Sequence, residues 1–363
     1  MIRITSTHQR FTDRLLSVLR KYFMVILVSL SIIVPMALLY YLDAPSFDKT
    51  WKGRTFYLFF IWLFAMELIL DWEKYVPEQK NEQRSIVRII ALAVAVALPS
   101  IYVVIEYFCG LNAAIVDLSL RNGIGATWAY VVPLSIEYLV FAAMFIAVFV
   151  AAYGMIGLKG FSISASLLAV IGFIYMTDNL IPGGNFTPFQ IIVPTTARLA
   201  AWVLNQMGYH TILFFSGNVP HLSATNVNGI TWGASIDWPC SGVESLIIYT
   251  VVMLLFLKKS TISWRQRTGY FAVGAVITYF INIFRIVTFY VIGTQTYPNA
   301  DALNKAIFLH HDYYGPLYSI IWITSYPLII IGTQLLWKKI RPKKTVVQNN
   351  LSPSEDKTAV LRT

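Results

Sequence analysis

Eight long apolar segments constrain the fold of this chain more than any other feature of its sequence. The hydrocarbon core of a bilayer is ~30 Å thick, so a helix that crosses it needs about 20 apolar residues. Only 13% of the 363 residues are charged, whereas soluble proteins contain about 25%. The sequence therefore predicts an all-α polytopic membrane protein with about eight transmembrane helices. These spans are expected at Tyr22–Leu42, Thr55–Leu70, Ile90–Cys109, Ala129–Tyr153, Ile163–Ile181, Gly242–Leu257, Gly269–Ile292 and Tyr314–Trp337.

The distribution of lysine and arginine predicts the orientation of these spans. With both termini inside, the inner segments hold 21 of the 28 Lys and Arg residues, the outer loops hold 6, and Arg285 lies within a span. Positive residues concentrate on the cytoplasmic side of membrane proteins. We therefore expect a multi-pass plasma-membrane protein whose N- and C-termini are cytoplasmic. The net charge of +10 follows this topology and does not indicate a nucleic-acid partner.

The longest outer loop, Pro182–Pro239, predicts a small extracytoplasmic structure. Within it, Gln190–Met207 is moderately apolar but is interrupted by Pro194 and Arg198, so we interpret it as a re-entrant or interfacial helix. The segment Thr211–Trp238 contains short apolar runs around an Asn-Val-Asn-Gly turn. That pattern indicates short β-strands or a hairpin at the membrane surface.

Cys240 lies in the stretch Ile236–Glu244, directly before an apolar run. Because Pro239 favours the first turn of a helix, we expect a helix to begin there with Cys240 in its first turn. The helix dipole and the unpaired amide groups of that turn would favour a thiolate. Glu244 would lie one turn deeper on the same helical face. The alternative is a packing cysteine at a helix end.

Arg285 is the strongest intramembrane candidate, because a charged group inside a bilayer costs several kcal/mol and marks a functional site by default. At 1.5 Å per residue it lies roughly 10 Å below the outer end of its span. Asn282 lies on the same helical face, three residues earlier. The alternative is a buried ion pair between Arg285 and a carboxylate. The carboxylates available for that pair are those of Glu244, Glu137 and Glu106.

Two adjacent histidines, His310 and His311, precede the last span. By themselves two such histidines are more often ordinary polar loop residues, but the predicted topology places them in the same leaflet as Cys240 and Arg285. A thiol nucleophile, an imidazole base and a guanidinium for a developing oxyanion form a workable acyl-transfer set. No metal-binding motif accompanies them. Asp178-Asn179, at the outer end of the fifth span, either caps that helix or lines the site.

Three short motifs fall at these positions, each at a helix boundary or in the outer leaflet. They are Cys240-Ser241-Gly242, Asn282-Ile283-Phe284-Arg285 and His311-Asp312-Tyr313-Tyr314-Gly315. In this order they resemble the exosortase/archaeosortase family, over about Ile163–Trp337. The resemblance implies a membrane cysteine transpeptidase that recognises a C-terminal sorting signal on exported proteins. Such a signal comprises a short motif, a transmembrane helix and a basic cluster. The enzyme would cleave near the motif through a thioester, at the extracytoplasmic face. It would then pass the protein to a membrane lipid or another lipid-linked acceptor.

The resemblance also implies a role for each motif residue. Cys240 would be the nucleophile, Arg285 the transition-state stabiliser and His311 the acid/base, since the family's histidine stands four residues before the glycine. The supporting residues would be Asn282, Glu244, Ser241, Gly242 and His310, and no cofactor is implied. On this basis the chain divides into an N-terminal four-helix membrane region (1–160), an exosortase-like catalytic membrane core (161–340) and a cytoplasmic, disordered polar tail (341–363).

Two other functions stay open at this stage. An intramembrane protease or acyltransferase would use the same residues without a sorting role, and the identity of the acceptor would separate it from a transpeptidase. A transporter would instead use Arg285, Glu244, Glu137 and Glu106 as a substrate or proton path, and would not need Cys240.

Overall fold

A computed structural model describes residues 3–49, 52–70, 86–181, 188–217, 219–259 and 262–340. Within these residues, seven helices are long and apolar enough to cross a membrane, and Thr55–Leu70 is a shorter apolar helix. The prediction of an all-α polytopic membrane protein is confirmed. The predicted tail, 341–363, lies outside the described residues. The long helices are α1 (Arg3–Leu42), α4 (Ile86–Phe108), α7 (Val132–Gly160), α8 (Ser162–Leu180), α10 (Glu244–Lys259), α11 (Trp264–Gly293) and α13 (Gly315–Ile340), and the shorter one is α2 (Thr55–Leu70).

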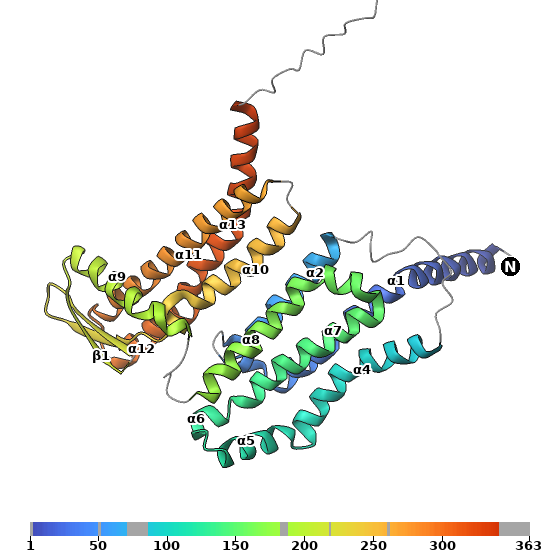
Figure 1. Ribbon diagram of the computed structural model, residues 1–363, viewed down its shortest axis with the longest axis horizontal. Coiled ribbons are helices and arrows are strands. Elements are labelled where there is room, and N and C mark those ends of the chain that lie inside the picture. Colours follow the sequence, from blue (N-terminus) through green and yellow to red (C-terminus); the bar gives the residue numbers. More distant parts are fainter. Residues whose placement is uncertain are drawn as a thin grey trace, which may run out of the picture.

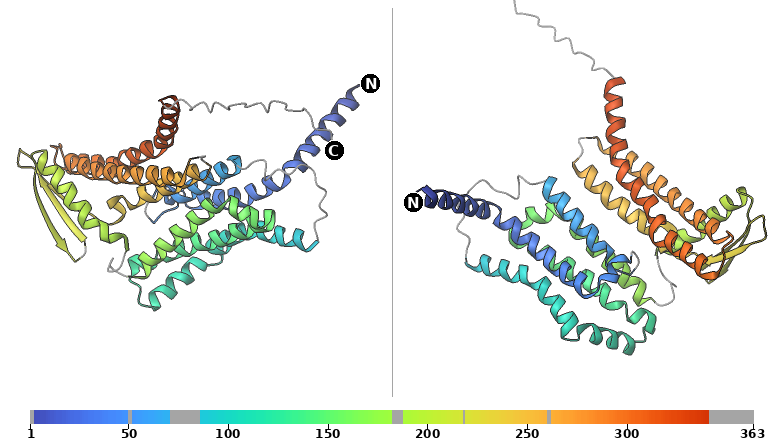
Figure 2. Two further views of the ribbon diagram at one scale, coloured as in Figure 1. Left: turned by 45° about the horizontal axis from the view of Figure 1, so that its top comes forward. Right: turned by 180° about the vertical axis from the view of Figure 1, so that it is seen from behind.

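The helices form two groups that are visible in Figure 1 and, from behind, in Figure 2. The N-terminal group contains α1, α2, α4, α7 and α8. Aromatic rings pair α2 with α7 at successive turns: Tyr57 stacks on Tyr138 with ring centroids 4.3 Å apart, and Phe60 stacks on Phe145 at 4.9 Å. All four side chains are fully buried. Such stacking adds to the burial of apolar area that packs this group.

The C-terminal group contains α10, α11 and α13, and it carries a small sheet at one end (Figure 1). The sheet consists of β1 (His210–Ser216), β2 (Val219–Thr225) and β3 (Thr231–Ser235), in antiparallel order β1-β2-β3. The predicted β region is therefore confirmed as a three-stranded sheet. The central strand alternates between half-buried and buried residues, as a strand with one packed face does.

Short helices complete this end of the molecule, which we call the sheet end. The helix α9 (Val193–Gln206) has 14 residues, too few to cross a bilayer, and it packs against β1 and β2. The helix α12 (Ala300–Leu309) lies beside the sheet in Figure 1, and α5 (Leu111–Arg121) and α6 (Ala126–Ala129) lie at the same end of the N-terminal group. The remaining short segments are the 3₁₀ helices η1 (Ala44–Asp48) and η3 (Pro188–Ile192).

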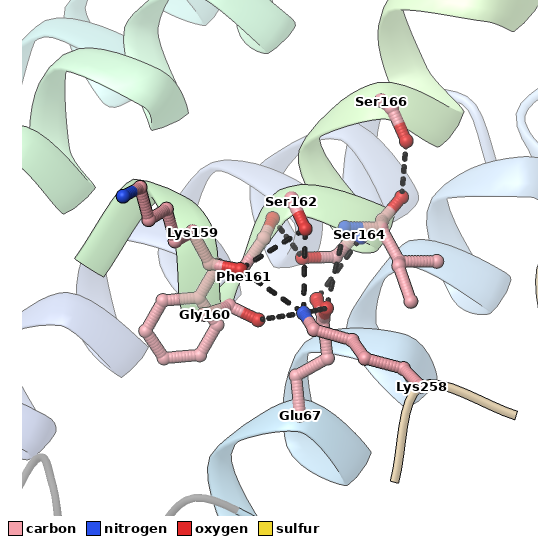
Figure 3. Close-up of polar contacts among 9 residues, drawn as sticks. Glu67, Lys159, Gly160, Phe161, Ser162, Ser164, Ser166 and Lys258 are labelled. Atoms are coloured by element: carbon pink, nitrogen blue, oxygen red, sulfur yellow. Dashed lines mark hydrogen bonds and ion pairs between the residues drawn. The ribbon is translucent and has the colours of Figure 1, made fainter. Parts of the chain in front are cut away.

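A polar junction joins the two groups at the C-terminal end of α10, which points away from the sheet in Figure 1, and Figure 3 shows its contacts. The carboxylate of Glu67 on α2 is 2% exposed and accepts hydrogen bonds from the first backbone amides of α8, at Ile163 and Ser164. It also accepts one from the ammonium of Lys258 on α10, 3.3 Å away. Lys258 in turn donates to the carbonyl of Gly160 at the end of α7. A buried carboxylate is stable there because helix amides and a cation both compensate its charge.

A second polar link joins the groups at the sheet end. Asp178 of α8 forms an ion pair with Lys52 at 2.7 Å and accepts a hydrogen bond from the indole of Trp238 at 3.1 Å. Trp238 directly precedes the turn that contains Cys240. Asp178 therefore connects the N-terminal group to the segment that presents the candidate nucleophile.

Candidate active site

The candidate thiol and imidazole both lie on π-helical turns at the sheet end. Cys240 is in η4 (Pro239–Val243), which leads into α10, and His311 is in η5 (His310–Tyr314), which leads into α13. Single π-turns of this kind are frequent at functional sites. The expectation of an α-helix from Pro239 differs from the structure, because α10 begins only at Glu244.

Gly242 explains why a regular helix does not begin at Pro239. Its φ is +99°, outside the helical region and open mainly to glycine. A Cβ atom at this position would come within 2.8 Å of the Asn282 side chain. The turn therefore depends on glycine both for its backbone and for its close approach to α11. The α-helical spacing expected between Cys240 and Glu244 does not apply across this turn.

Cys240 and His311 face each other across the two turns. The Sγ atom of Cys240 lies 3.7 Å from Nε2 of His311, a hydrogen-bond distance for sulfur. Both residues are half-buried. Neither Cys240 nor Cys109 forms a disulfide. The structure thus brings together a thiol and an imidazole that are 71 residues apart in the chain.

Arg285 reaches the same place from α11. Its Nη2 donates a hydrogen bond to the backbone carbonyl of His311 at 3.1 Å. A Cβ atom on Gly315 would come within 2.7 Å of the Arg285 Nε, so glycine at this position lets the guanidinium pass. Glu137, one of the acidic partners considered for Arg285, pairs instead with Arg54. Glu106 and Glu137 belong to the N-terminal group of helices.

Asn282 connects α11 to the nucleophile's turn. It is fully buried, and its Nδ2 donates to the backbone carbonyl of Cys240 at 3.2 Å. Ser241, also fully buried, donates from Oγ to the carbonyl of Trp238 at 2.6 Å. Glu244 is half-buried at the first position of α10. These contacts hold the Cys240 turn from both sides.

The two histidines have different environments. His310 is 3% exposed, with Nε2 3.2 Å from the Thr288 hydroxyl and 3.4 Å from the Arg285 carbonyl. Its ring stacks on Phe289. Burial lowers the pKa of His310, the Arg285 carbonyl opposes that shift, and the charges of Arg285 and His311 reinforce it. The geometry therefore assigns the imidazole next to the thiol to His311 and a packing position to His310.

A small cavity of about 40 Å³ joins these groups. It has room for a few water molecules, so a peptide carbonyl would have to enter from its mouth. Its walls include two residues that sequence reasoning missed. Tyr290 is buried and donates from its hydroxyl to Ala234 of β3 at 2.9 Å, and the Phe289 ring lies 5.5 Å from that of His311. The sequence feature that could have revealed Phe289 and Tyr290 is their position four and five residues after Arg285. The lining residues are Ser235, Ile236, Cys240, Arg285, Ile286, Phe289, Tyr290, His310 and His311.

These features define a multi-pass membrane protein with a thiol, an imidazole and a guanidinium gathered at one end of its helices. The family model described as transmembrane exosortase (Exosortase_EpsH) matches residues 50–326. The chain belongs to the transmembrane exosortase family. Its match extends the resemblance seen in the sequence from Ile163 back to residue 50. No curated protein and no solved structure matches the chain.

Membership of this family assigns the chain a general activity. Exosortases are membrane cysteine transpeptidases that act on exported proteins bearing sorting signals. The chain is therefore an enzyme of the membrane transpeptidase class with a role in protein sorting.

Proposed function

We propose that Cys240 cleaves the C-terminal sorting signal of exported proteins through a thioester and that the protein is then passed to a lipid or lipid-linked acceptor. The observation that carries this proposal is the 3.7 Å contact between Cys240 Sγ and His311 Nε2, with the Arg285 guanidinium bound to the His311 turn. A nucleophile within reach of a base, with a cation beside both, is the arrangement that acyl transfer requires.

In the first half-reaction, His311 accepts the proton of the Cys240 thiol and the thiolate attacks the peptide carbonyl. The carbonyl oxygen becomes an oxyanion, and the Arg285 guanidinium stabilises its charge. When the tetrahedral intermediate collapses, the C–N bond breaks and His311 returns its proton to the leaving amine. The protein is left as a thioester on Cys240, and the released peptide carries the rest of the sorting signal.

In the second half-reaction, an amine or hydroxyl of the acceptor attacks the thioester. His311 removes a proton from the acceptor and gives it to the Cys240 sulfur as the C–S bond breaks. The thiol is restored, and the protein is joined to the acceptor by an amide or ester bond. Water in place of the acceptor would give hydrolysis by the same steps.

The neighbouring residues support this chemistry by position. Asn282 holds the Cys240 carbonyl, and Ser241 and Gly242 set the shape of its turn. Glu244 begins the helix that follows the turn. His310 packs on Phe289, whose ring also lies near that of His311. We assign these five as positioning residues because their interactions shape the turns that present the thiol and imidazole.

We also propose that the site faces the extracytoplasmic side and that both termini are cytoplasmic. The 21-to-6 bias of Lys and Arg supports this orientation. In this arrangement the core 161–340 carries the catalytic residues, and the region 1–160 stabilises it through two ion pairs, Lys52 with Asp178 and Glu67 with Lys258.

The test is processing of a reporter protein that carries a C-terminal sorting signal, in membranes that contain the full chain. Cys240→Ala should abolish cleavage and transfer while the protein still accumulates in the membrane. Cys109→Ala is the matched control, because Cys109 is exposed in the N-terminal group and should be dispensable. Normal processing by Cys240→Ala would refute the proposal. Cleavage with water as the sole acceptor would restrict the enzyme to hydrolysis.

A further inference from the structure

A second cavity, of about 590 Å³, lies in the N-terminal group between η1, α4, α5 and α7. None of its lining residues lines the cavity at Cys240. One of its walls is α5, which lies at the end of the N-terminal group in Figure 1. Unlike the apolar surface that α2 shares with α10 and α13, this cavity is bordered by carboxylate, amide and cationic side chains.

Three acceptor atoms of this cavity have no hydrogen-bond donor among the described residues. Glu106 is 1% exposed, and none of the described residues donates a hydrogen bond to either of its carboxylate oxygens. The same holds for the amide oxygen of Asn112. Burying such groups without partners is costly, and native proteins rarely leave them so. A bound group that supplies hydrogen-bond donors to these three atoms would therefore stabilise the cavity.

The charge balance of the cavity favours a cation. The buried guanidinium of Arg54 is committed to Glu137 at 2.5 and 2.8 Å and to Asp43 at 2.6 Å. Glu106 lies beside Glu137, and two buried carboxyl groups this close are not both ionised unless a further cation is near, so an empty cavity leaves a proton on Glu106. The ammonium of Lys52, which also borders the cavity, is bound to Asp178. A cation that enters the cavity would replace that proton and pair with the ionised Glu106.

We propose that this cavity binds a primary ammonium group carried by a lipid headgroup of the ethanolamine type. A primary ammonium has three N–H donors, which matches the two Glu106 oxygens and the Asn112 oxygen. Lys49 borders the same cavity and is exposed, so it can meet the phosphate attached to the amine. Tyr107 and Tyr130 also line the cavity, and tyrosine is enriched at the level of lipid headgroups.

This proposal does not rest on the transpeptidase mechanism, since its readout is binding and stability. It gives the N-terminal helices a task of their own, recognition of a membrane component. The same ammonium chemistry could come from a lipid or from a free headgroup, and the arms of the experiment separate these sources.

The test uses the purified full chain in maltoside micelles and follows its thermal unfolding midpoint. The probes are short-chain phosphatidylethanolamine, phosphatidylcholine with the same acyl chains, and free phosphoethanolamine. Phosphatidylethanolamine should raise the midpoint in a saturable way. Phosphatidylcholine should not, because its quaternary ammonium has no N–H donor. If free phosphoethanolamine also stabilises the protein, the headgroup alone suffices; if it does not, the acyl chains are needed as well.

Glu106→Gln keeps the shape of the side chain and removes its charge. It should weaken the apparent affinity for phosphatidylethanolamine about 10- to 100-fold, as expected for loss of a charged hydrogen-bond partner. Asn112→Ala, at a half-buried position, should weaken it less. Asp117→Asn is the matched control, because Asp117 lines the same cavity but is exposed and paired with Arg121. Equal stabilisation by the two lipids, or an unchanged preference in Glu106→Gln, would overturn the proposal and leave water as the occupant.

Discussion

The guanidinium of Arg285 donates a hydrogen bond to the backbone carbonyl of His311, 3.1 Å away. The residue proposed to stabilise the oxyanion therefore also holds the turn that presents the proposed base. Gly315 makes this contact possible, because a side chain at that position would collide with Arg285. The two motifs therefore depend on each other: the Arg285 guanidinium fits beside the His311 turn because position 315 carries no side chain.

Replacing Arg285 by lysine should lower the rate of processing sharply. Lysine keeps the charge but loses the planar fork that can serve the His311 carbonyl and an oxyanion together. Loss of one oxyanion donor typically costs ~10²–10³ in rate, and we expect a fall of at least that size in kcat for a sorting reporter. Arg198→Lys, at an exposed position on α9, is the control and should retain activity. An Arg285→Lys enzyme of normal rate would remove Arg285 from the mechanism.

The two neighbouring histidines should separate when each is replaced by alanine. His311→Ala removes the imidazole next to Cys240 Sγ and should leave little processing. His310→Ala removes a buried, hydrogen-bonded ring and should cost about 1–3 kcal/mol of stability with a mild effect on activity per folded molecule. Thermal unfolding and specific activity, measured on the same preparations, distinguish these outcomes. The reverse pattern would move the acid/base to His310.

Stability should fall as the pH drops below about 6.5, the ordinary pKa of histidine, because burial lowers the pKa of His310. In that range the unfolded chain binds a proton that the folded chain excludes, so acid favours unfolding. The contribution is fully present above pH 6.5 and is lost as the pH approaches the folded-state pKa. Unfolding midpoints measured from pH 8 to about pH 5 should therefore decline less in His310→Gln. Parallel curves for the two proteins would contradict the assignment.

Gly242→Ala should impair catalysis through the position of Cys240. The φ of +99° is unfavourable for alanine, and the new methyl group would lie 2.8 Å from the Asn282 side chain. We expect a loss of about 1–3 kcal/mol in stability from backbone strain and a larger relative loss in thioester formation. Gly332→Ala is the matched control, since a Cβ atom there meets nothing within 4 Å. Trapping the acyl-enzyme with a substrate analogue measures the step directly. Unimpaired trapping in Gly242→Ala would show that the turn tolerates a side chain.

Much of the architecture follows from local features of the sequence. The lengths of the apolar segments predicted the spans, because a helix that satisfies its own backbone hydrogen bonds is the stable form of such a segment in a bilayer. The prediction of short strands at Thr211–Trp238 rested on turn residues such as Gly229, whose φ is +78° in the turn between β2 and β3. These signals lie within one segment and do not depend on its neighbours.

The start of the helix after Pro239 is where local reasoning failed. Pro239 is typical of a helix start, but the chain forms a π-turn there, in which Gly242 has a positive φ and lies against Asn282. Asn282 is 40 residues further along the chain. A rule based on neighbouring residues has no access to such a contact.

By itself, the sequence determined which segments enter the membrane and which residue types could perform acyl transfer. Only the tertiary structure decided how those residues meet: His311 rather than His310 faces Cys240, Arg285 holds the His311 turn, and Glu137 pairs with Arg54. Adjacent residues on a turn point in different directions, and ion pairs form between whichever helices pack together. Insertion depends on the composition of each segment, whereas the site depends on contacts between segments that packing alone creates.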